Sequence, residues 1–254
     1  MKKLYEKNEI SFAILWIMIY IVGMGTLKNN FGLESLWPML GLIVISGAML
    51  LFVLKNGLAE KYGLTGWAKN SKAMLWFLPL WFISCLNLLS GFRQDCPVPG
   101  VIYAAVSMAL VGFAEEMIFR GFLFKAMLKD GNVKAAIIVA SVAFGLGHIV
   151  NLFTGQDLTE TLYQVVFAAA VGFIFTFAFY KGGSLLPCIL AHSLVDVTSV
   201  FAADEGSQSL DLILHALVVV VAAAYCFYLA KRVETPAVNR TDREQGSSSG
   251  RDRS

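Results

Sequence analysis

Long apolar stretches recur along the whole chain and constrain its fold more than any other feature. A helix needs about 20 mostly apolar residues to cross about 30 Å of hydrocarbon, and eight stretches approach that length. They are residues 11–27, 36–54, 74–91, 101–126, 134–150, 161–180, 185–201 and 211–230. Only 15% of the residues are charged and 57% are hydrophobic, whereas about a quarter are charged in soluble domains. The sequence predicts an all-α, polytopic membrane bundle of about eight transmembrane helices.

Lys and Arg residues gather on alternate connections between these stretches. The N-terminus, the second, fourth and sixth connections and the C-terminal segment are basic, and the other connections carry few positive charges. Because cytoplasmic loops are enriched in Lys and Arg, both termini are predicted to be cytoplasmic (N-in, C-in). This orientation accounts for the basic residues behind the net charge of +2, and no nucleic-acid partner is expected.

The chain is predicted to form one integral membrane domain over residues 1–233. Residues 234–254 have few apolar side chains to bury and are predicted to be a disordered cytoplasmic tail. The first apolar run lacks a small-x-small cleavage site and is followed by seven further spans, so we expect an uncleaved helix rather than a signal peptide. The expected location is the membrane, as a multi-pass protein of the inner or plasma membrane if bacterial. Residues 55–72 fit either a segment on the inner membrane surface or a hydrated loop.

Six ionisable residues lie inside the predicted spans and away from their ends. They are Glu115, Glu116, Arg120, His148, His192 and Asp196. A carboxylate or guanidinium costs about 2.5–3.5 kcal/mol at the centre of a membrane helix, so these groups need compensation. Glu116 and Arg120 are spaced i,i+4 with the acid first, which is the favourable order for an ion pair. A purely structural role, in which the charges neutralise one another and lock helices together, is one interpretation.

Glu115 lies about 100° around the helix from Glu116 and needs a partner on another helix. His192 and Asp196 are also i,i+4, so HSLVD presents both side chains on one face. His148 ends the segment FGLGH, whose two glycines remove side-chain bulk and would let another helix approach closely. Two other spans therefore offer groups that could meet Glu115.

Depth along the helices is consistent with such a meeting for three of the four groups. Counting 1.5 Å per residue from the cytoplasmic ends puts Glu115 and Asp196 about 17 Å deep and His192 about 11 Å deep. His148 comes out about 21 Å deep, and it joins the others only if its helix begins in the interface or tilts.

Three short motifs follow one another on separate spans. They are EEMIFR at 115–120, FGLGH at 144–148 and HSLVD at 192–196. In this order they resemble the CPBP intramembrane protease family, which includes the type II CAAX prenyl endopeptidases. That family is marked by Glu-Glu-x-x-x-Arg, Phe-x-x-x-His and His-x-x-x-Asn or Asp. The resemblance covers residues 110–200, and the first three spans and the tail carry no matching motif.

The resemblance implies an intramembrane endopeptidase that hydrolyses a peptide bond of a membrane-associated peptide or protein. Peptide hydrolysis needs a water that loses its proton during attack and a group that stabilises the oxyanion. By the resemblance, Glu115 would be the general base and would bind the water together with His148. His192 and Asp196 would steady the oxyanion or help to hold a metal.

The same resemblance gives Glu116 and Arg120 a supporting role in fixing their helix. A zinc ion bound by His148, His192 and Glu115 fits the family's description as metalloproteases, and a metal-free glutamate mechanism fits equally. The helical His-Glu-x-x-His motif of soluble zinc proteases is absent from the sequence. The role of a metal cofactor stays open at this point.

Asp196 stands where the CAAX endopeptidases have Asn. An amide can donate a hydrogen bond to an oxyanion, whereas an ionised carboxylate can only accept one. Asp196 is therefore protonated, orients His192 or ligates a metal. This difference weakens any transfer of specificity for prenylated proteins.

Two other classes of function remain as alternatives. A non-catalytic membrane protein, such as an immunity or partner-binding factor, would keep the charged cluster only to hold its helices together (helix-helix glue). A proton or ion carrier also uses buried Glu, His and Asp, but the sequence lacks the paired repeats typical of transporters. The expected partners are membrane lipid and a peptide or protein substrate, with or without a lipid modification.

Overall fold

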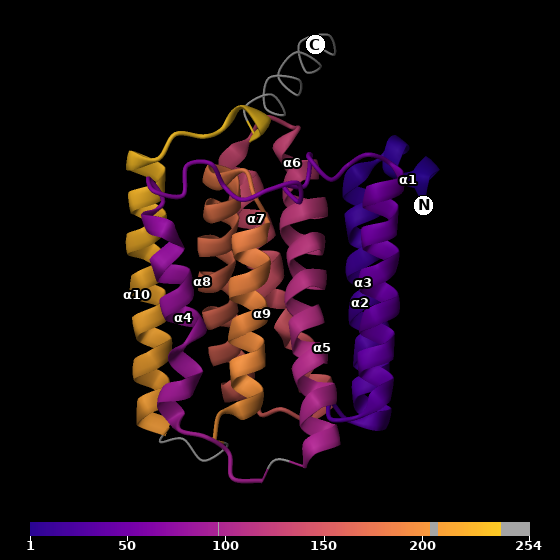
Figure 1. Ribbon diagram of the computed structural model, residues 1–254, viewed down its shortest axis with the longest axis vertical. Coiled ribbons are helices and arrows are strands. Elements are labelled where there is room, and N and C mark those ends of the chain that lie inside the picture. Colours follow the sequence, from indigo (N-terminus) through magenta and orange to yellow (C-terminus); the bar gives the residue numbers. More distant parts are fainter. Residues whose placement is uncertain (96, 204–207, 240–254) are drawn as a thin grey trace.

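The computed structural model describes residues 1–95, 97–203 and 208–239, apart from the side chains of residues 154 and 208–211. In this part of the chain the named elements are all helical, and one isolated bridge joins Phe92 to Ala202. The helices pack side by side as a bundle (Figure 1). The first helix and the end of the last helix lie at the same end of it, called here the termini end (Figure 1).

Six described helical stretches are long and apolar enough to cross a membrane, and two shorter ones are also apolar. The long ones are α2 (Glu9–Phe31), α3 (Leu36–Lys55), Val98–Leu128, Val133–Phe153, α8 (Leu158–Gly182) and α10 (Gln208–Arg232). The shorter ones are Leu75–Ser90 and α9 (Leu186–Phe201), and α1 (Lys2–Lys7) precedes them all. Each of the eight predicted apolar segments contains helix, but only six of the described helical stretches are long enough to cross a membrane. The cytoplasmic placement of both ends stays a prediction.

The third predicted span, 74–91, is shorter and more irregular than the sequence suggested. It divides into η1 (Leu75–Phe77), α4 (Leu78–Ser84) and η2 (Leu86–Ser90). The residues of η1 have positive φ angles, with Trp76 at 51°, so they cannot continue a right-handed helix. A proline stands in the first turn of α4, where its missing N–H leaves no bond unmade.

The connection between α3 and η1 crosses the termini end of the bundle (Figure 1). Tyr62 is 1% exposed and Ala68 is 5% exposed. The carbonyl of Gly63 accepts a hydrogen bond from the backbone N–H of Leu185, with the two atoms 3.0 Å apart. These buried side chains do not suit a hydrated loop, and contact with the membrane surface stays a prediction.

Packing continues beyond α10 into the segment predicted to be a tail. Asn239 is fully buried. Its Oδ1 atom accepts a hydrogen bond from Lys125 Nζ at 2.8 Å, and its Nδ2 atom donates to the carbonyl of Tyr180 at 2.7 Å. The ordered contacts thus reach Asn239, and residues 240–254 of the predicted tail lie outside the described residues.

Glycines bring two pairs of helices into close contact. A Cβ atom at Gly112 of α5 (Val98–Glu116) would overlap the backbone of Ser193 on α9, lying 2.7 Å from its Cα atom. A Cβ atom at Gly145 of α7 (Val133–Gly147) would lie 2.8 Å from the carbonyl oxygen of Val165 on α8. The predicted close approach at FGLGH is therefore made by Gly145, while Gly147 faces only a Phe119 side chain at ordinary contact distance.

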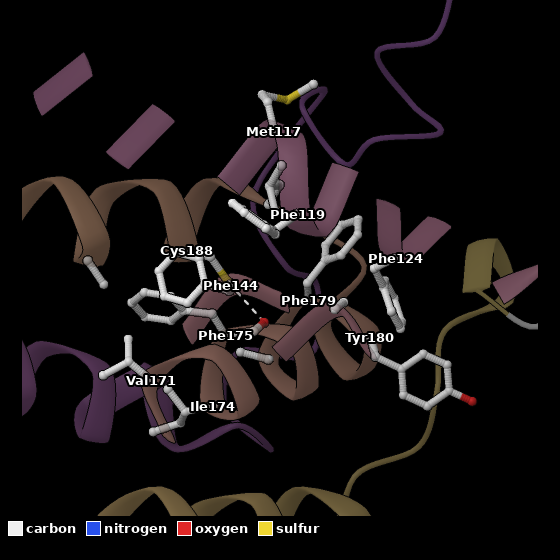
Figure 2. Close-up of a cluster of buried hydrophobic side chains, with 14 of the residues drawn as sticks. Met117, Phe119, Phe124, Phe144, Val171, Ile174, Phe175, Phe179, Tyr180 and Cys188 are labelled. Atoms are coloured by element: carbon white, nitrogen blue, oxygen red, sulfur yellow. Dashed lines mark hydrogen bonds between the residues drawn. The ribbon is translucent and has the colours of Figure 1, made fainter. Parts of the chain in front are cut away.

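The core of the bundle is rich in aromatic side chains from three helices. Figure 2 shows this packing around Phe119, Phe144, Phe175 and Phe179. Cys188 of α9 lies among them, and its thiol donates to the carbonyl of Phe175 at 3.4 Å. The rings of Phe144 and Phe175 also lie 5.5 and 5.6 Å from the ring of His192, so this core packs against a predicted site residue.

Candidate active site

The acidic pair stands where α5 changes its helical form. Glu115 and Glu116 are the last residues of α5, and the chain continues without a break as a π-helix, η3 (Met117–Phe124). Every side chain of η3 is buried. Segments of π-helix are rare and occur often at functional sites. Here the wider turn begins immediately after the two carboxylates.

Arg120 of η3 pairs with Glu116, as the i,i+4 spacing predicted. Its Nη1 atom lies 2.7 Å from Glu116 Oε1, and both side chains are 0% exposed. Its Nη2 atom donates to the carbonyl of Gly172 on α8 at 3.3 Å. The guanidinium carbon lies 4.2 Å from the centre of the Phe144 ring, a cation–π contact. The ion pair, the hydrogen bond and the cation–π contact together offset the cost of burying the guanidinium charge.

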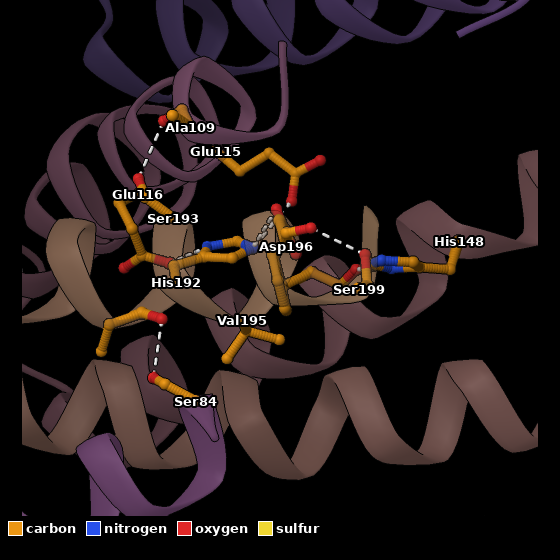
Figure 3. Close-up of polar contacts among 12 residues, drawn as sticks. Ser84, Ala109, Glu115, Glu116, His148, His192, Ser193, Val195, Asp196 and Ser199 are labelled. Carbon is orange, nitrogen blue, oxygen red and sulfur yellow. Dashed lines mark hydrogen bonds and ion pairs between the residues drawn. The ribbon is translucent and has the colours of Figure 1, made fainter. Parts of the chain in front are cut away.

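His192 of α9 joins the same pair, which the sequence did not indicate. Its Nδ1 atom lies 2.9 Å from Glu116 Oε1. Because a carboxylate accepts hydrogen bonds, Nδ1 carries the proton and Nε2 faces the opposite way. Nε2 lies 3.4 Å from Asp196 Oδ2 and 3.7 Å from Glu115 Oε2. Figure 3 shows His192 between Glu116 on one side and Glu115 with Asp196 on the other.

Glu115 has a second partner, Tyr20 of α2, that no motif pointed to. The Tyr20 hydroxyl donates to Glu115 Oε1 at 2.7 Å. A single tyrosine in a long apolar helix gives no periodic or spacing signal, so only coordinates could reveal this contact. The side chain of Glu115 is 13% exposed and that of Asp196 is 19% exposed, whereas Glu116 is fully buried.

His148 lies on the wall of the same cavity but farther from the carboxylates. It begins the 3-10 helix η4 (His148–Thr154), and its Nδ1 atom lies 3.2 Å from the carbonyl oxygen of Phe144. A carbonyl only accepts, so Nδ1 carries the proton and Nε2 is the free acceptor. Among the described residues, His148 makes no hydrogen bond or ion pair with Glu115, His192 or Asp196. The depth count had already set His148 apart from these three groups.

One cavity of about 280 Å³ is lined by Tyr20, Glu115, His148, His192 and Asp196. Its lining on α2 runs from Tyr20 to Lys28, and its lining on α9 runs from His192 to Ser199. On both helices this direction leads away from the termini end (Figure 1). The cavity therefore extends from the carboxylates toward the end of the bundle that carries the α2–α3 connection.

An aromatic cluster fills the space on the other side of the carboxylates. Phe122 packs against Phe12, Trp16 and Tyr62, with ring centres 5.1, 6.3 and 5.3 Å apart, respectively. All four side chains are at most 5% exposed. We call these four residues the aromatic seal, because they pack closely between the cavity and the termini end.

The side chains of the described residues do not assemble a metal site. In the described ranges no group of three or more His, Cys, Asp or Glu residues is placed to hold a metal ion. Of the predicted ligands Glu115, His148 and His192, the first and last are close together, and His148 makes no contact with either. The three predicted ligands, as placed here, therefore do not fit a bound metal ion.

Comparison with known proteins agrees with the motifs. Residues 97–198 match the family model described as Type II CAAX prenyl endopeptidase Rce1-like. This region of the chain is similar to the Rce1-like family. The Rce1-like region includes every predicted site residue from Glu115 to Asp196, and the family resemblance drawn from the three motifs is confirmed. It excludes Tyr20 and the whole of α2.

A curated relative extends the similarity beyond the Rce1-like region. It is the protein named "Putative membrane peptidase YdiL" of Bacillus subtilis (strain 168). The two are 24% identical over 212 residues, which cover 74% of this chain and 79% of the relative. No solved structure matches the chain significantly. Together with the multiple membrane-spanning helices, these findings make the protein a multi-pass membrane protein that is similar to membrane peptidases.

Proposed function

We propose that the protein is an intramembrane endopeptidase that hydrolyses a peptide bond of a membrane-associated peptide or protein. The observation that carries the proposal is the placement of Glu115 in the cavity. One of its oxygens is tied to Tyr20, and the other faces His192 Nε2 at 3.7 Å. The carboxylate is partly accessible, as a group that must meet water and substrate should be. The Rce1-like match and the peptidase name of the relative support the reaction class.

Glu115 is the proposed general base. Its Oε2 atom takes a proton from a water in the cavity while the water oxygen attacks the carbonyl carbon of the scissile bond. The carbonyl oxygen becomes an oxyanion. When the intermediate collapses, the C–N bond breaks and Glu115 returns the proton to the leaving amine. The side chain is then restored for another turnover.

His192 is the proposed donor to the oxyanion. Its Nδ1–H is held by Glu116, so a proton on Nε2 points toward the cavity. The carboxylates of Glu115 and Asp196 lie within 3.7 Å of Nε2, so this nitrogen faces the same part of the cavity as the proposed base. Of the three interpretations of Asp196, its 3.4 Å approach to Nε2 supports the one in which it orients His192.

His148 is proposed to contact the attacking water from the cavity wall. Its Nδ1–H is used by the Phe144 carbonyl, which leaves Nε2 as an acceptor for a water proton. Glu116 and Arg120 have the supporting role, because they hold His192 in place without facing the cavity. A cytoplasmic location of both termini remains part of the proposal, supported by the basic connections. A lipid group on the substrate is not required by any of these contacts.

The test is cleavage of a peptide library by purified protein in detergent. Glu115→Gln keeps the size of the side chain and one oxygen for Tyr20, but an amide cannot act as a base. We expect cleavage to fall by at least about 100-fold while the melting temperature stays near that of the wild type. Glu160→Gln, at an exposed carboxylate in the first turn of α8, is the matched control and should cleave normally. Equal cleavage by wild type and Glu115→Gln would show that Glu115 is not the general base.

The alternative, a non-catalytic protein that uses the cluster as helix-helix glue, is favoured by one observation. The Glu116–Arg120 pair is fully buried and contacts α8 and α9, as glue would. The two functions differ at Glu115. In a purely structural cluster, Glu115→Gln would change the melting temperature and no peptide would be cut by either protein.

A further inference from the structure

Tyr20 connects the first long helix to the acidic motif. Its hydroxyl donates to Glu115 Oε1 at 2.7 Å, across 95 positions of sequence. Tyr20 also lines the cavity that holds Glu115, His148, His192 and Asp196. A hydrogen bond to an ionised acceptor is roughly twice as strong as one between neutral groups. The contact therefore joins α2, which lies outside the Rce1-like region, to the reacting group.

The contact also decides which carboxylate oxygen is free. Glu115 has one hydrogen bond and one ion-pair contact among the described residues, to Tyr20 through Oε1 and to His192 through Oε2. Without the phenol, the carboxylate could rotate about its terminal torsion, which is broad and roughly two-fold. With Oε1 held, Oε2 stays directed at His192 and at the space where a water would be shared.

Tyr20 is itself held firmly in place. One and two turns earlier on α2, Trp16 and Phe12 belong to the aromatic seal. At the start of the same helix, Glu9 Oε2 pairs with Lys61 Nζ at 2.6 Å. Because α2 is fixed along this length, the hydroxyl is preorganised and does not have to be ordered during the reaction.

Resting on the proposed function, we propose that Tyr20 is a positioning residue that holds the Glu115 carboxylate in the orientation in which it activates water. The active site is then completed by a helix that carries none of the family motifs. Tyr20 acts through Glu115 and not on the substrate. Its loss should reduce turnover and leave substrate binding almost unchanged.

The first test is kinetic. Tyr20→Phe removes only the hydroxyl, and we expect kcat to fall about 10- to 100-fold with KM within about 2-fold of the wild type. Tyr225→Phe is the matched control, because it removes a hydroxyl that donates to the Met74 carbonyl at 2.7 Å, away from the cavity. The control should keep its kcat. A wild-type kcat in Tyr20→Phe would overturn the proposal.

The second test reads the carboxylate directly and does not depend on activity. The infrared difference spectrum between Tyr20→Phe and wild type should contain a shifted carboxylate stretching band. The band should be missing when the same substitution is made in Glu115→Gln. A band that persists there would show that Tyr20 acts on another group, which overturns the proposal. Peptide cleavage by Glu115→Gln itself would instead contradict the proposed function, whatever the spectrum of Tyr20→Phe.

Discussion

One oxygen of Glu116, Oε1, lies 2.7 Å from Arg120 Nη1 and 2.9 Å from His192 Nδ1. The Glu116–Arg120 ion pair, which the sequence predicted to support one helix, thus also holds His192 of α9. The buried ion pair fixes the ring of His192, and the ring presents Nε2 to the cavity. Stability and geometry of the site are therefore coupled through a single carboxylate.

Arg120→Ala should lower both stability and activity. It leaves the Glu116 carboxylate buried without its cation, a change that costs about 3–5 kcal/mol for buried pairs. We expect a lower yield of membrane-inserted protein and a lower melting temperature in detergent. Lys2→Ala is the control, because Lys2 pairs with Glu6 at 3.7 Å on an exposed surface and such pairs contribute about 0–1 kcal/mol. Normal melting of Arg120→Ala would count against the buried pair.

Asp196→Asn should retain most of the cleavage activity, and Asp196→Ala should lose it. Asn keeps an oxygen that can accept from His192 Nε2 and adds an amide donor. Ala removes the contact at 3.4 Å and leaves the ring less well oriented, for which we expect a loss of about 100-fold in kcat. The two variants are compared by kcat and KM on one peptide. Loss of activity in both would indicate that the charge of Asp196 is essential.

Gly112→Ala should disturb the contact between α5 and α9. The new Cβ atom would overlap the backbone of Ser193, so the helices must separate and carry Glu116 away from His192. Overpacking of this kind costs about 1–3 kcal/mol. Gly47→Ala on α3 is the matched control, since nothing lies within 4 Å of its added Cβ atom. Melting temperature and kcat should both fall for Gly112→Ala only.

A cysteine at the outer part of the cavity should react with water-soluble thiol reagents, and one in the aromatic seal should not. Ser199→Cys lines the cavity and is exposed, whereas Phe122 is 1% exposed. Both are made in a variant without the native cysteines. In sealed vesicles, an impermeant reagent should reach position 199 only from the membrane side opposite the termini. Labelling of Phe122→Cys at the same rate would contradict the seal.

The sequence alone identified the helical segments, the ion pair of Glu116 with Arg120 and the three motifs that meet in the cavity. These follow from apolar length and from i,i+4 spacing, which are local properties. The interruption at Trp76 was missed because apolar length does not report left-handed backbone. Contacts of Tyr20 with Glu115 and of His192 with Glu116 join distant helices, and no spacing rule encodes them. The direction in which the cavity extends depends on how side chains from several helices pack, so it could not be predicted from the sequence.

The aromatic seal has a consequence for the membrane as a whole. The labelling prediction implies that water near Glu115 exchanges with only one of the two compartments, because Phe12, Trp16, Tyr62 and Phe122 pack closely on the side of the termini end. A continuous file of water past several carboxylates and imidazoles would conduct protons and dissipate the transmembrane voltage. By blocking that file, the four rings would let the proposed hydrolytic centre lie inside the bilayer without making the bilayer conduct protons.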